Sequence, residues 1–353
     1  DQTPTTNSPS EDDGDDPTPV TGSPTTDGGG GGATTAADGG STDGAIPPPP
    51  IIFDVGEVVD LPPGSCAAPA QISCDHMDDD PWHAIGLNCP GGQQVQGSVT
   101  LQGPQQLYVH NGNLGTFNPP TYPPREGNKF VILSSGNAQD MTVPGMFAST
   151  QVGGASPLLP PIVTNSVSAT EDCVANPALV GTGDCSNTIE MQWNQGTGSN
   201  DYAEMRLVTE VPPGVPGFTY DFAMFSTEYP DFYQDTFNDM FIAWLESEQW
   251  TGNISFDDMG NPISLNAGFL DFKDAPNPYD CPAPCTAPEL MGTAMEGHAG
   301  TRWLTTNAGV VPGETIEVIF AVFDLTDGIL DTVVLLDNFQ WACAGGGPST
   351  IPG

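Results

Sequence analysis

The stretch FSTEYPDFYQDTFNDMF, residues 225–241, combines six aromatic rings with four carboxylates and contains no basic side chain. Its carboxylates are Glu228, Asp231, Asp235 and Asp239. Carboxylates that pack among aromatic rings lose hydration, and a buried charge needs a counter-charge or a proton. Because the stretch offers no Lys or Arg, these groups are solvated, protonated or bound to a metal ion.

A second acidic segment, DLTDGILDTVVLLDN at 324–338, leads into a run of apolar residues. Both segments lie at the ends of expected strands, since residues 217–227 alternate as a strand before Glu228 and Asp239 opens the next run. If these ends meet at one rim, the carboxylates and nearby loop carbonyls form the set of about 6–8 hard oxygens that Ca²⁺ prefers. Mg²⁺ requires a tighter octahedron and transition metals favour nitrogen or sulfur.

We therefore expect a Ca²⁺ site formed by Glu228, Asp239, Asp324, Asp327 and Asp331. The alternative is that these residues are ordinary turn formers whose charges are solvated. The aromatic side chains around Glu228 favour burial, and hence a bound cation.

Two other groups of residues could hold a metal. The run CDHMDDDPWH at 74–83 contains His76, His83 and four aspartates, but a solvated loop is the favoured interpretation. A zinc site would use Cys281, Cys285 and His298, yet zinc needs four well-spaced ligands and no second cysteine pair matches. We expect no metal at either place.

The charge of the chain excludes several classes of partner. Forty-five acidic residues oppose five bases, giving a formal net charge of -40. Residues 51–353 hold 36 of the carboxylates and all five bases, so this part alone has a net charge of about -31. Nucleic acid and anionic lipid are poor partners for such a surface, whereas divalent cations would offset its self-repulsion. No apolar run approaches 18 residues, so we expect no membrane span.

Eight cysteines, an even number, indicate disulfides formed in an oxidising compartment. We expect four disulfides and no free thiol, with local pairs Cys173–Cys185 and Cys281–Cys285. The other four cysteines then pair among themselves, and Cys343 ties the last strand to the N-terminal loop; they are Cys66, Cys74, Cys89 and Cys343. Eight cysteines permit 105 connectivities, so the spacing does not fix the pairing.

The composition divides the chain into three parts. Residues 1–50 are a Thr-, Gly-, Pro- and Asp-rich stalk or linker, residues 51–345 form the folded domain, and residues 346–353 are a flexible tail. Short β-type runs separated by turn residues fill the middle part, and no helical periodicity is sustained. The pattern predicts an all-β fold, an antiparallel β-sandwich of jelly-roll or lectin-like type, with long disulfide-stapled loops and an extended N-terminal tail.

The strands are expected at runs of alternating or apolar residues, namely 130–135, 188–193, 202–211, 217–227, 239–247, 316–325 and 333–341. In the run 202–211, Ala203, Met205 and Leu207 share one face and Glu204 and Arg206 share the other. This alternation is typical of a half-buried strand. The phase of 241–250 places Trp244 opposite Ala243 and Leu245, which would expose one face of its ring.

Four blocks of residues resemble a known family: REGNKFVILSSG at 125–136, NDYAEMRLVTEVP at 200–212, residues 218–246 and residues 300–341. Together they resemble the choice-of-anchor L domain of secreted and surface-attached bacterial proteins, over roughly residues 93–343 after a Cys-rich lead-in at 51–92. The family's two acidic motifs correspond to Glu228 with Asp239 and to Asp327 with Asp331. The resemblance implies export and a cell-surface or matrix location.

No catalytic motif is present: the chain lacks a nucleophile elbow, a His-Glu-x-x-His pair, a phosphate loop and a dinucleotide fingerprint. We expect a non-enzymatic, secreted or cell-surface, Ca²⁺-binding structural or adhesion protein that self-associates or joins other matrix components. The alternative is a Ca²⁺-dependent carbohydrate-binding module for polysaccharide, using Trp244, Trp250, Trp303 and Trp341. A glycoside hydrolase, which needs only a suitable carboxylate pair, ranks third.

Overall fold

The computed structural model describes residues 65–145, 151–165, 188–268, 270–275 and 285–353. All of them belong to one compact unit, Ala45–Gly353. The expected stalk at 1–50 and the cysteines at 173, 185 and 281 lie outside the described residues.

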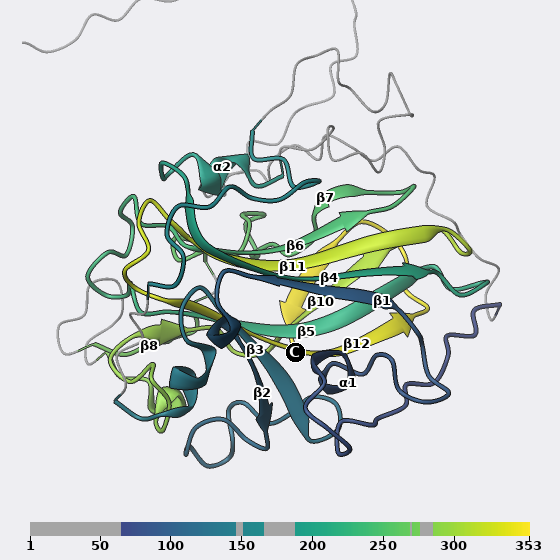
Figure 1. The fold of residues 1–353 in the computed structure, drawn as a ribbon, viewed down its shortest axis with the longest axis horizontal. Helices are drawn as coiled ribbons and strands as arrows, with labels where there is room; N and C mark the ends of the chain where they lie inside the picture. The colour runs from purple at the N-terminus through teal and green to yellow at the C-terminus, as the bar shows by residue number, and fades with distance from the viewer. Residues whose placement is uncertain (1–64, 146–150, 166–187, 269, 276–284) are drawn as a thin grey trace, which may run out of the picture. The chain divides into compact units, whose positions relative to one another are not determined.

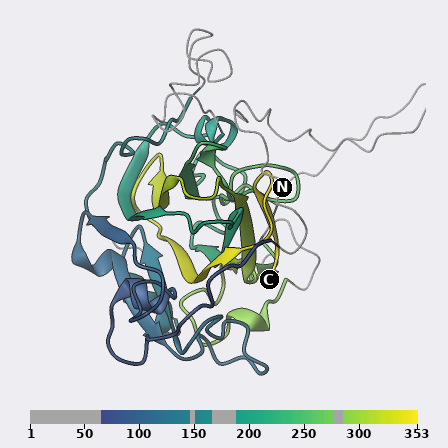
Figure 2. The same cartoon turned by 90° about the vertical axis from the view of Figure 1, so that its right-hand side faces the viewer.

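The described residues form two packed antiparallel sheets, as the alternating runs predicted. The first sheet has the order β1-β4-β11-β6-β7, and the second has the order β13-β10-β5-β12-β3-β2 with β8 and β9 attached beside β5. In Figure 1, β6, β11, β4 and β1 lie above β5 and β12. Turned by 90°, Figure 2 shows residues 65–145, in blue, gathered on one side of the sandwich.

The first sheet consists of β1 (Gln96–Leu101), β4 (Ser199–Glu210), β11 (Thr315–Leu325), β6 (Met240–Glu246) and β7 (Thr251–Asn253). The second consists of β13 (Ser349–Pro352), β10 (Leu304–Gly309), β5 (Gly217–Ser226), β12 (Thr332–Ala342), β3 (Lys129–Ser134) and β2 (Leu107–Asn111), with β8 (Phe272–Lys273) and β9 (Ala299–Gly300). The helical turns are α1 (Pro81–Ala84), η1 (Pro104–Gln106), η2 (Ala138–Thr142), α2 (Glu190–Trp193) and η4 (Pro288–Leu290).

The main core lies between the sheets. Leu207 of β4 pairs in register with Val318 of β11, and Phe222 of β5 pairs with Leu336 of β12. These side chains belong to one buried apolar cluster. Burying a Val, Leu or Phe side chain contributes about 1.5–3 kcal/mol, so the inward faces of the long strands hold the sandwich together.

Loops also cover the outer faces of both sheets. On the first sheet, Trp244 and Ile319 pack beneath Leu158, Leu159 and Trp193. On the second, Phe225 and Val333 pack with Tyr122, Leu290 and Trp303. The central strands β4, β5, β6, β11 and β12 therefore bury most of both faces, which corrects the expectation of half-buried strands. Glu204, on the outer face of β4, is 2% exposed and bonded to Arg206 and Tyr202.

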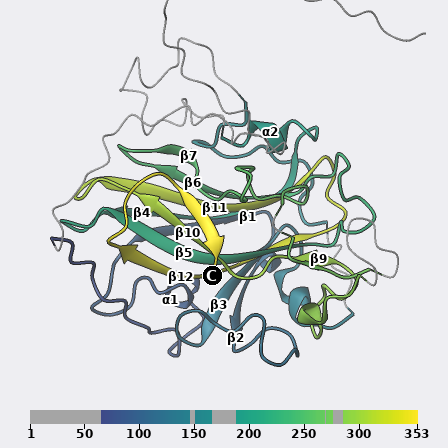
Figure 3. The same cartoon turned by 180° about the vertical axis from the view of Figure 1, so that it is seen from behind.

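Two local expectations are wrong. Residues 188–193 form a turn and the four-residue helix α2 instead of a strand, and they cover the first sheet. Its buried Gln192 bonds to Asn238 and Ser264, so tertiary contacts override the alternating pattern. The segment expected as a flexible tail contains β13, which pairs with β10 from Leu304↔Pro352 to Asn307↔Ser349. Figure 3 shows β13 as the yellow arrow ending at the C-terminus.

Two disulfides are described, Cys66–Cys343 and Cys74–Cys89. They confirm that these four cysteines pair among themselves and that Cys343 ties the end of β12 to the N-terminal segment. Cys285 is also in a disulfide, and none of the described cysteines is free. A cysteine in a disulfide is not a thiolate ligand, so Cys285 does not serve the zinc alternative.

Candidate metal centre

The acidic segments meet at one end of the sandwich because four long strands end or begin there. Thr332, the first residue of β12, pairs with Ser226, the last residue of β5, and Met240, the first residue of β6, pairs with Phe323 near the end of β11. The strand ends place Glu228 two residues beyond β5, and Asp239 and Asp331 immediately before β6 and β12.

Asp239 links the two sheets. Its Oδ1 accepts the backbone N–H of Leu325 at 2.9 Å, and its Oδ2 accepts the hydroxyl of Thr332 at 2.7 Å. Asp239 is 0% exposed. Burial raises the pKa of this carboxyl above its ordinary value, these two hydrogen bonds oppose the rise, and Asp327 adds to it.

Asp324 is buried among other carboxylates. It lies within β11, as the strand expected at 316–325 implied, at the point where the register against β4 shifts between Val322 and Asp324. It is 1% exposed, and neither of its oxygens accepts a hydrogen bond from a described residue. Burial raises its pKa well above the ordinary value, the charges of Asp239, Asp331 and Asp201 raise it further, and the nearby Ser135 hydroxyl partly opposes them.

Glu228 is buried at the same end, 2% exposed. Its Oε2 has no hydrogen-bond partner among the described residues. Burial is the main cause that raises its pKa, followed by the charges of Asp239, Asp327 and Asp235. In the loop that joins Glu228 to Asp239, the rings of Phe232 and Phe237 pack edge to face with their centroids 5.0 Å apart.

Asp327 and Asp331 complete the expected set. Asp327 is partly exposed at the rim, where its Oδ1 accepts the backbone N–H of Ile329 at 3.2 Å. Asp331 is 1% exposed, and its backbone carbonyl accepts both the N–H and the hydroxyl of Thr227. Each of the five residues chosen from the sequence therefore lies at this end of the sandwich.

Sequence reasoning missed a sixth carboxylate, Asp201. It is fully buried in β4 with a positive φ of 51°, and its Oδ1 accepts the backbone N–H of Gly153 at 2.6 Å. Its Oδ2 has no partner among the described residues. The signal available in the sequence was an Asn-Asp pair just before the apolar run at 202, where a bulge-forming residue is common.

Two glycines allow the backbone to approach these carboxylates closely. A Cβ added to Gly136, just beyond β3, would lie 2.0 Å from Oδ2 of Asp331. A Cβ added to Gly328 would lie 2.4 Å from Oδ2 of Asp201. Any larger residue at either place would displace a carboxylate, so backbone and side-chain oxygens pack together here in a way that glycine alone permits.

The Arg and Lys side chains of the described ion pairs bind carboxylates outside this cluster. Arg125 pairs with Asp221, Lys129 with Asp79, Arg206 with Glu204 and Glu317, and Arg302 with Asp271. Lys273 lies over the ring of Tyr233, with Nζ 4.7 Å from the ring centroid. These ion pairs and this ring contact involve none of the six carboxylates that gather at this end of the sandwich.

The cluster offers only hard oxygen donors. No three Asp, Glu, His or Cys side chains of the described residues already stand in the geometry of a bound metal ion. An ion would therefore bind only after these carboxylates change position. Without a cation, their mutual repulsion is relieved by protonation, which is what the raised pKa values of Glu228, Asp239 and Asp324 express.

The other acidic run, 74–83, has structural partners. Asp75 accepts the N–H of Lys129 at 2.6 Å, Asp80 caps α1, and Asp78 lies 2.8 Å from Nδ1 of His83. The Cys74–Cys89 disulfide closes this loop. Together with the Lys129–Asp79 ion pair, these contacts give each of its four aspartates a partner within the protein.

The four tryptophans proposed for sugar stacking are buried. Trp244 is 0% exposed, and the other three are at most 6% exposed: Trp250, Trp303 and Trp341. The alternation correctly placed Trp244 on the outer face of β6, but the loops above that face cover it. An exposed tryptophan platform is therefore a wrong expectation for these four residues.

Among known protein families, residues 87–340 match the choice-of-anchor L domain. No curated protein and no solved structure matches the chain. No helix of the described residues is long and apolar enough to cross a membrane.

Proposed function

The chain belongs to the choice-of-anchor L family, and from this premise we propose that it is a non-enzymatic protein of the bacterial surface or extracellular matrix whose sandwich is fastened by Ca²⁺. The family and the disulfides are consistent with a surface-anchored, extracellular protein.

One observation supports the Ca²⁺ site above all others. Asp324 is buried with both carboxylate oxygens lacking a hydrogen-bond partner among the described residues, and three more carboxylates surround it. An unpaired buried charge costs several kcal/mol, and a divalent cation reverses the sign of every interaction in the cluster. Ca²⁺ suits the cluster better than Zn²⁺ because every side-chain donor is an oxygen.

The position of the cluster supports a structural role. Its residues lie within or next to β4, β5, β6, β11 and β12, which come from both sheets. An ion held by Glu228, Asp239, Asp324 and Asp331, with Asp327 at the rim and Asp201 behind, would therefore join the sheets at the end where their strands change direction. Such an ion stabilises the folded state by mass action, because the unfolded chain does not assemble the site.

We propose that the partner in this surface role is a second copy of the same chain. The first sheet ends in β1, whose first five residues are exposed, and the second sheet ends in β13. Exposed edge strands provide unpaired backbone groups with which a strand of another chain can pair.

Calorimetric titration of metal-stripped protein, combined with thermal unfolding, tests the Ca²⁺ site. We expect Ca²⁺ to bind and to raise the melting temperature, and EDTA to lower it. Asp239→Asn and Asp331→Asn should remove most of this response, because each deletes a charged oxygen ligand. Asp258→Asn, at an exposed aspartate outside the cluster, should keep it. Unchanged melting of demonstrably metal-free protein on addition of Ca²⁺ would falsify the site.

A further inference from the structure

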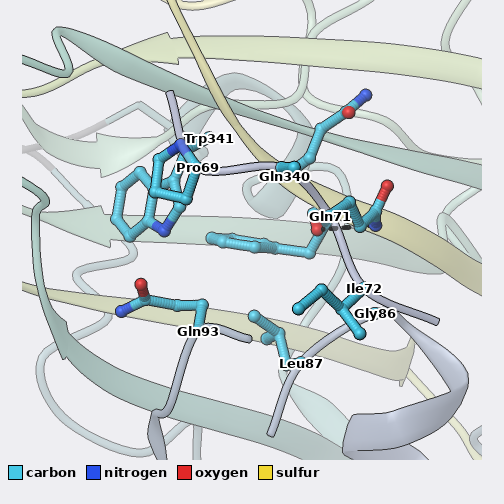
Figure 4. A pocket seen from close by; sticks show the side chains of 10 residues that line it. Pro69, Gln71, Ile72, Gly86, Leu87, Gln93, Gln340 and Trp341 are labelled. Atoms are coloured by element: carbon cyan, nitrogen blue, oxygen red, sulfur yellow. Dashed lines mark hydrogen bonds between the residues drawn. The ribbon is translucent and has the colours of Figure 1, made fainter. Parts of the chain in front are cut away.

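A small pocket lies between the N-terminal segment and β12, at a place that the metal centre does not touch. One wall is the strap, which we define as residues 66–74, and the opposite wall includes Phe339, Gln340 and Trp341 of β12. Figure 4 shows Pro69 and Gln71 of the strap facing Trp341 and Gln340, with Gln93 and Leu87 across the opening.

Disulfides hold the strap at both ends. Cys66 is bonded to Cys343, two residues beyond Trp341, and Cys74 is bonded to Cys89. Between them, Nε2 of Gln71 donates to the backbone carbonyl of Phe339 at 3.1 Å. The wall is thus fixed covalently relative to β12, and a rigid wall reduces the entropy that a ligand would otherwise lose on binding.

The indole of Trp341 has a donor to offer. The side chain is 6% exposed, and its buried Nε1 has no hydrogen-bond partner among the described residues. In Figure 4 this nitrogen faces the space between Trp341 and Gln93. Leaving a buried N–H without an acceptor is unfavourable, so an oxygen that enters the pocket gains a hydrogen bond for which the protein offers no substitute.

The lining contains no ionisable side chain, although the chain has a net charge of -40. Its polar groups are the amides of Gln71, Gln93 and Gln340, and its apolar groups include Phe339 and Leu87. The N–H of Gln93 is fixed on Thr209 at 2.8 Å, which leaves the amide oxygen as an acceptor. Amide acceptors beside an indole donor and apolar rings match hydroxyl groups on a neutral ring.

The size of the pocket limits what can enter. The open space, counted together with the solvent at the mouth, is about 310 Å³, and most of it lies outside the enclosed cavity. The enclosed part accommodates only about one or two water molecules. A ligand would therefore insert one hydroxyl and rest the remainder of its ring at the mouth, against the exposed Pro69 and Gln340.

We propose that this pocket binds a neutral saccharide, with one sugar hydroxyl accepting the N–H of Trp341 and the ring seated between the strap and β12. Recognition needs no metal, because no carboxylate lines the pocket. It is independent of the Ca²⁺ site and is compatible with a protein displayed among cell-surface polysaccharides.

Saturation-transfer NMR and calorimetry of the full chain, in EDTA and at low temperature, test this proposal. The probes are methyl glycosides of neutral hexoses and N-acetylhexosamines, a uronic acid of matching size and a neutral acetylated tripeptide amide. We expect at least one neutral glycoside to bind and the uronic acid to bind more weakly. Trp341→Phe, which keeps the ring and loses the N–H, should weaken binding about three- to tenfold, the effect of one hydrogen bond.

Two further variants test whether binding depends on the pocket itself. Trp303→Phe removes a buried indole N–H that donates to Pro123 at 3.1 Å, outside the pocket, and should leave glycoside binding unchanged. Gln340→Ala alters an exposed side chain at the mouth and should weaken binding without affecting the fold. Absence of binding by every glycoside at millimolar concentration, equal binding by Trp341→Phe and wild type, or binding of the tripeptide alone would overturn the proposal, leaving a site for water or for peptide.

Discussion

Glu228→Gln should stabilise the metal-free protein and destabilise the Ca²⁺-loaded protein. Without a cation, burial and neighbouring carboxylates raise the pKa of Glu228 from 4.5 to about 9. At about pH 7.5 the folded chain then keeps a proton that the unfolded chain has released, which opposes folding by about 4 kcal/mol at 1.36 kcal/mol per pH unit. Glutamine has no such proton, although burying its amide costs about 1–3 kcal/mol.

The net gain expected for Glu228→Gln in EDTA is therefore about 1–3 kcal/mol. In Ca²⁺ at about a thousand times the dissociation constant, wild type gains about 4.1 kcal/mol that the variant largely lacks, so the order of stability reverses. Denaturant midpoints with disulfides intact, in EDTA and in Ca²⁺, measure both differences at constant m. A variant that is less stable than wild type in EDTA, or that differs from it equally in both conditions, would refute the reasoning.

Four further outcomes follow from the same structure. The free energy of unfolding of the metal-free protein should fall as pH rises from 3.8 to about 7 for Asp239 and from 4.5 to about 9 for Glu228, because in these pH ranges the folded state holds protons that the unfolded state has released. Ca²⁺ should stabilise the protein more at the alkaline end, and urea midpoints that rise with pH in EDTA would contradict this. Gly136→Ala should abolish the Ca²⁺ response, because its Cβ would meet Asp331, whereas Gly347→Ala, whose added Cβ meets no atom within 4 Å, should keep it; retention of the response by both variants counts against the site. Replacing Cys66 and Cys343 by serine opens a loop of 277 residues and should lower the free energy of unfolding by about 5–6 kcal/mol through chain entropy. Replacing Cys74 and Cys89 opens a loop of 15 residues and should lower it by about 3 kcal/mol, and denaturant midpoints in the opposite order would reject this ranking. Thiol titration of denatured, unreduced protein should detect no reactive cysteine, and two or more per chain would refute four disulfides.

The long strands were predictable because their apolar residues alternate with period two over many positions. The runs expected at 130–135, 316–325 and 333–341 correspond to β3, β11 and β12 within one or two residues. The alternation does not indicate that loops cover the outer faces of the sheets. Trp244 and Glu204 point away from the core, as predicted, yet both are buried because loops from elsewhere in the chain cross that face.

The candidate site was predictable as far as its residues lie at strand ends, since antiparallel neighbours bring those ends together. Asp201 could not be found in this way, because its place depends on a positive φ within β4 and on the backbone of Gly153. Gly136 was equally hidden, because its contact with Asp331 joins positions 195 residues apart. Such contacts follow from the sheet order and not from any local pattern.

The Cys66–Cys343 bond has a mechanical consequence. A pulling force applied across these two residues would pass through one covalent bond, and β3, β5, β11 and β12, which lie between them in the chain, would bear no load. Beyond Cys343 the situation differs, because β13 is held to β10 by only four paired positions. Tension applied beyond Cys343 would break the pairing of β13 with β10 one residue at a time, while the rest of the sandwich stayed folded. On a surface exposed to flow, the domain would remain rigid and only the short segment beyond Cys343 would extend.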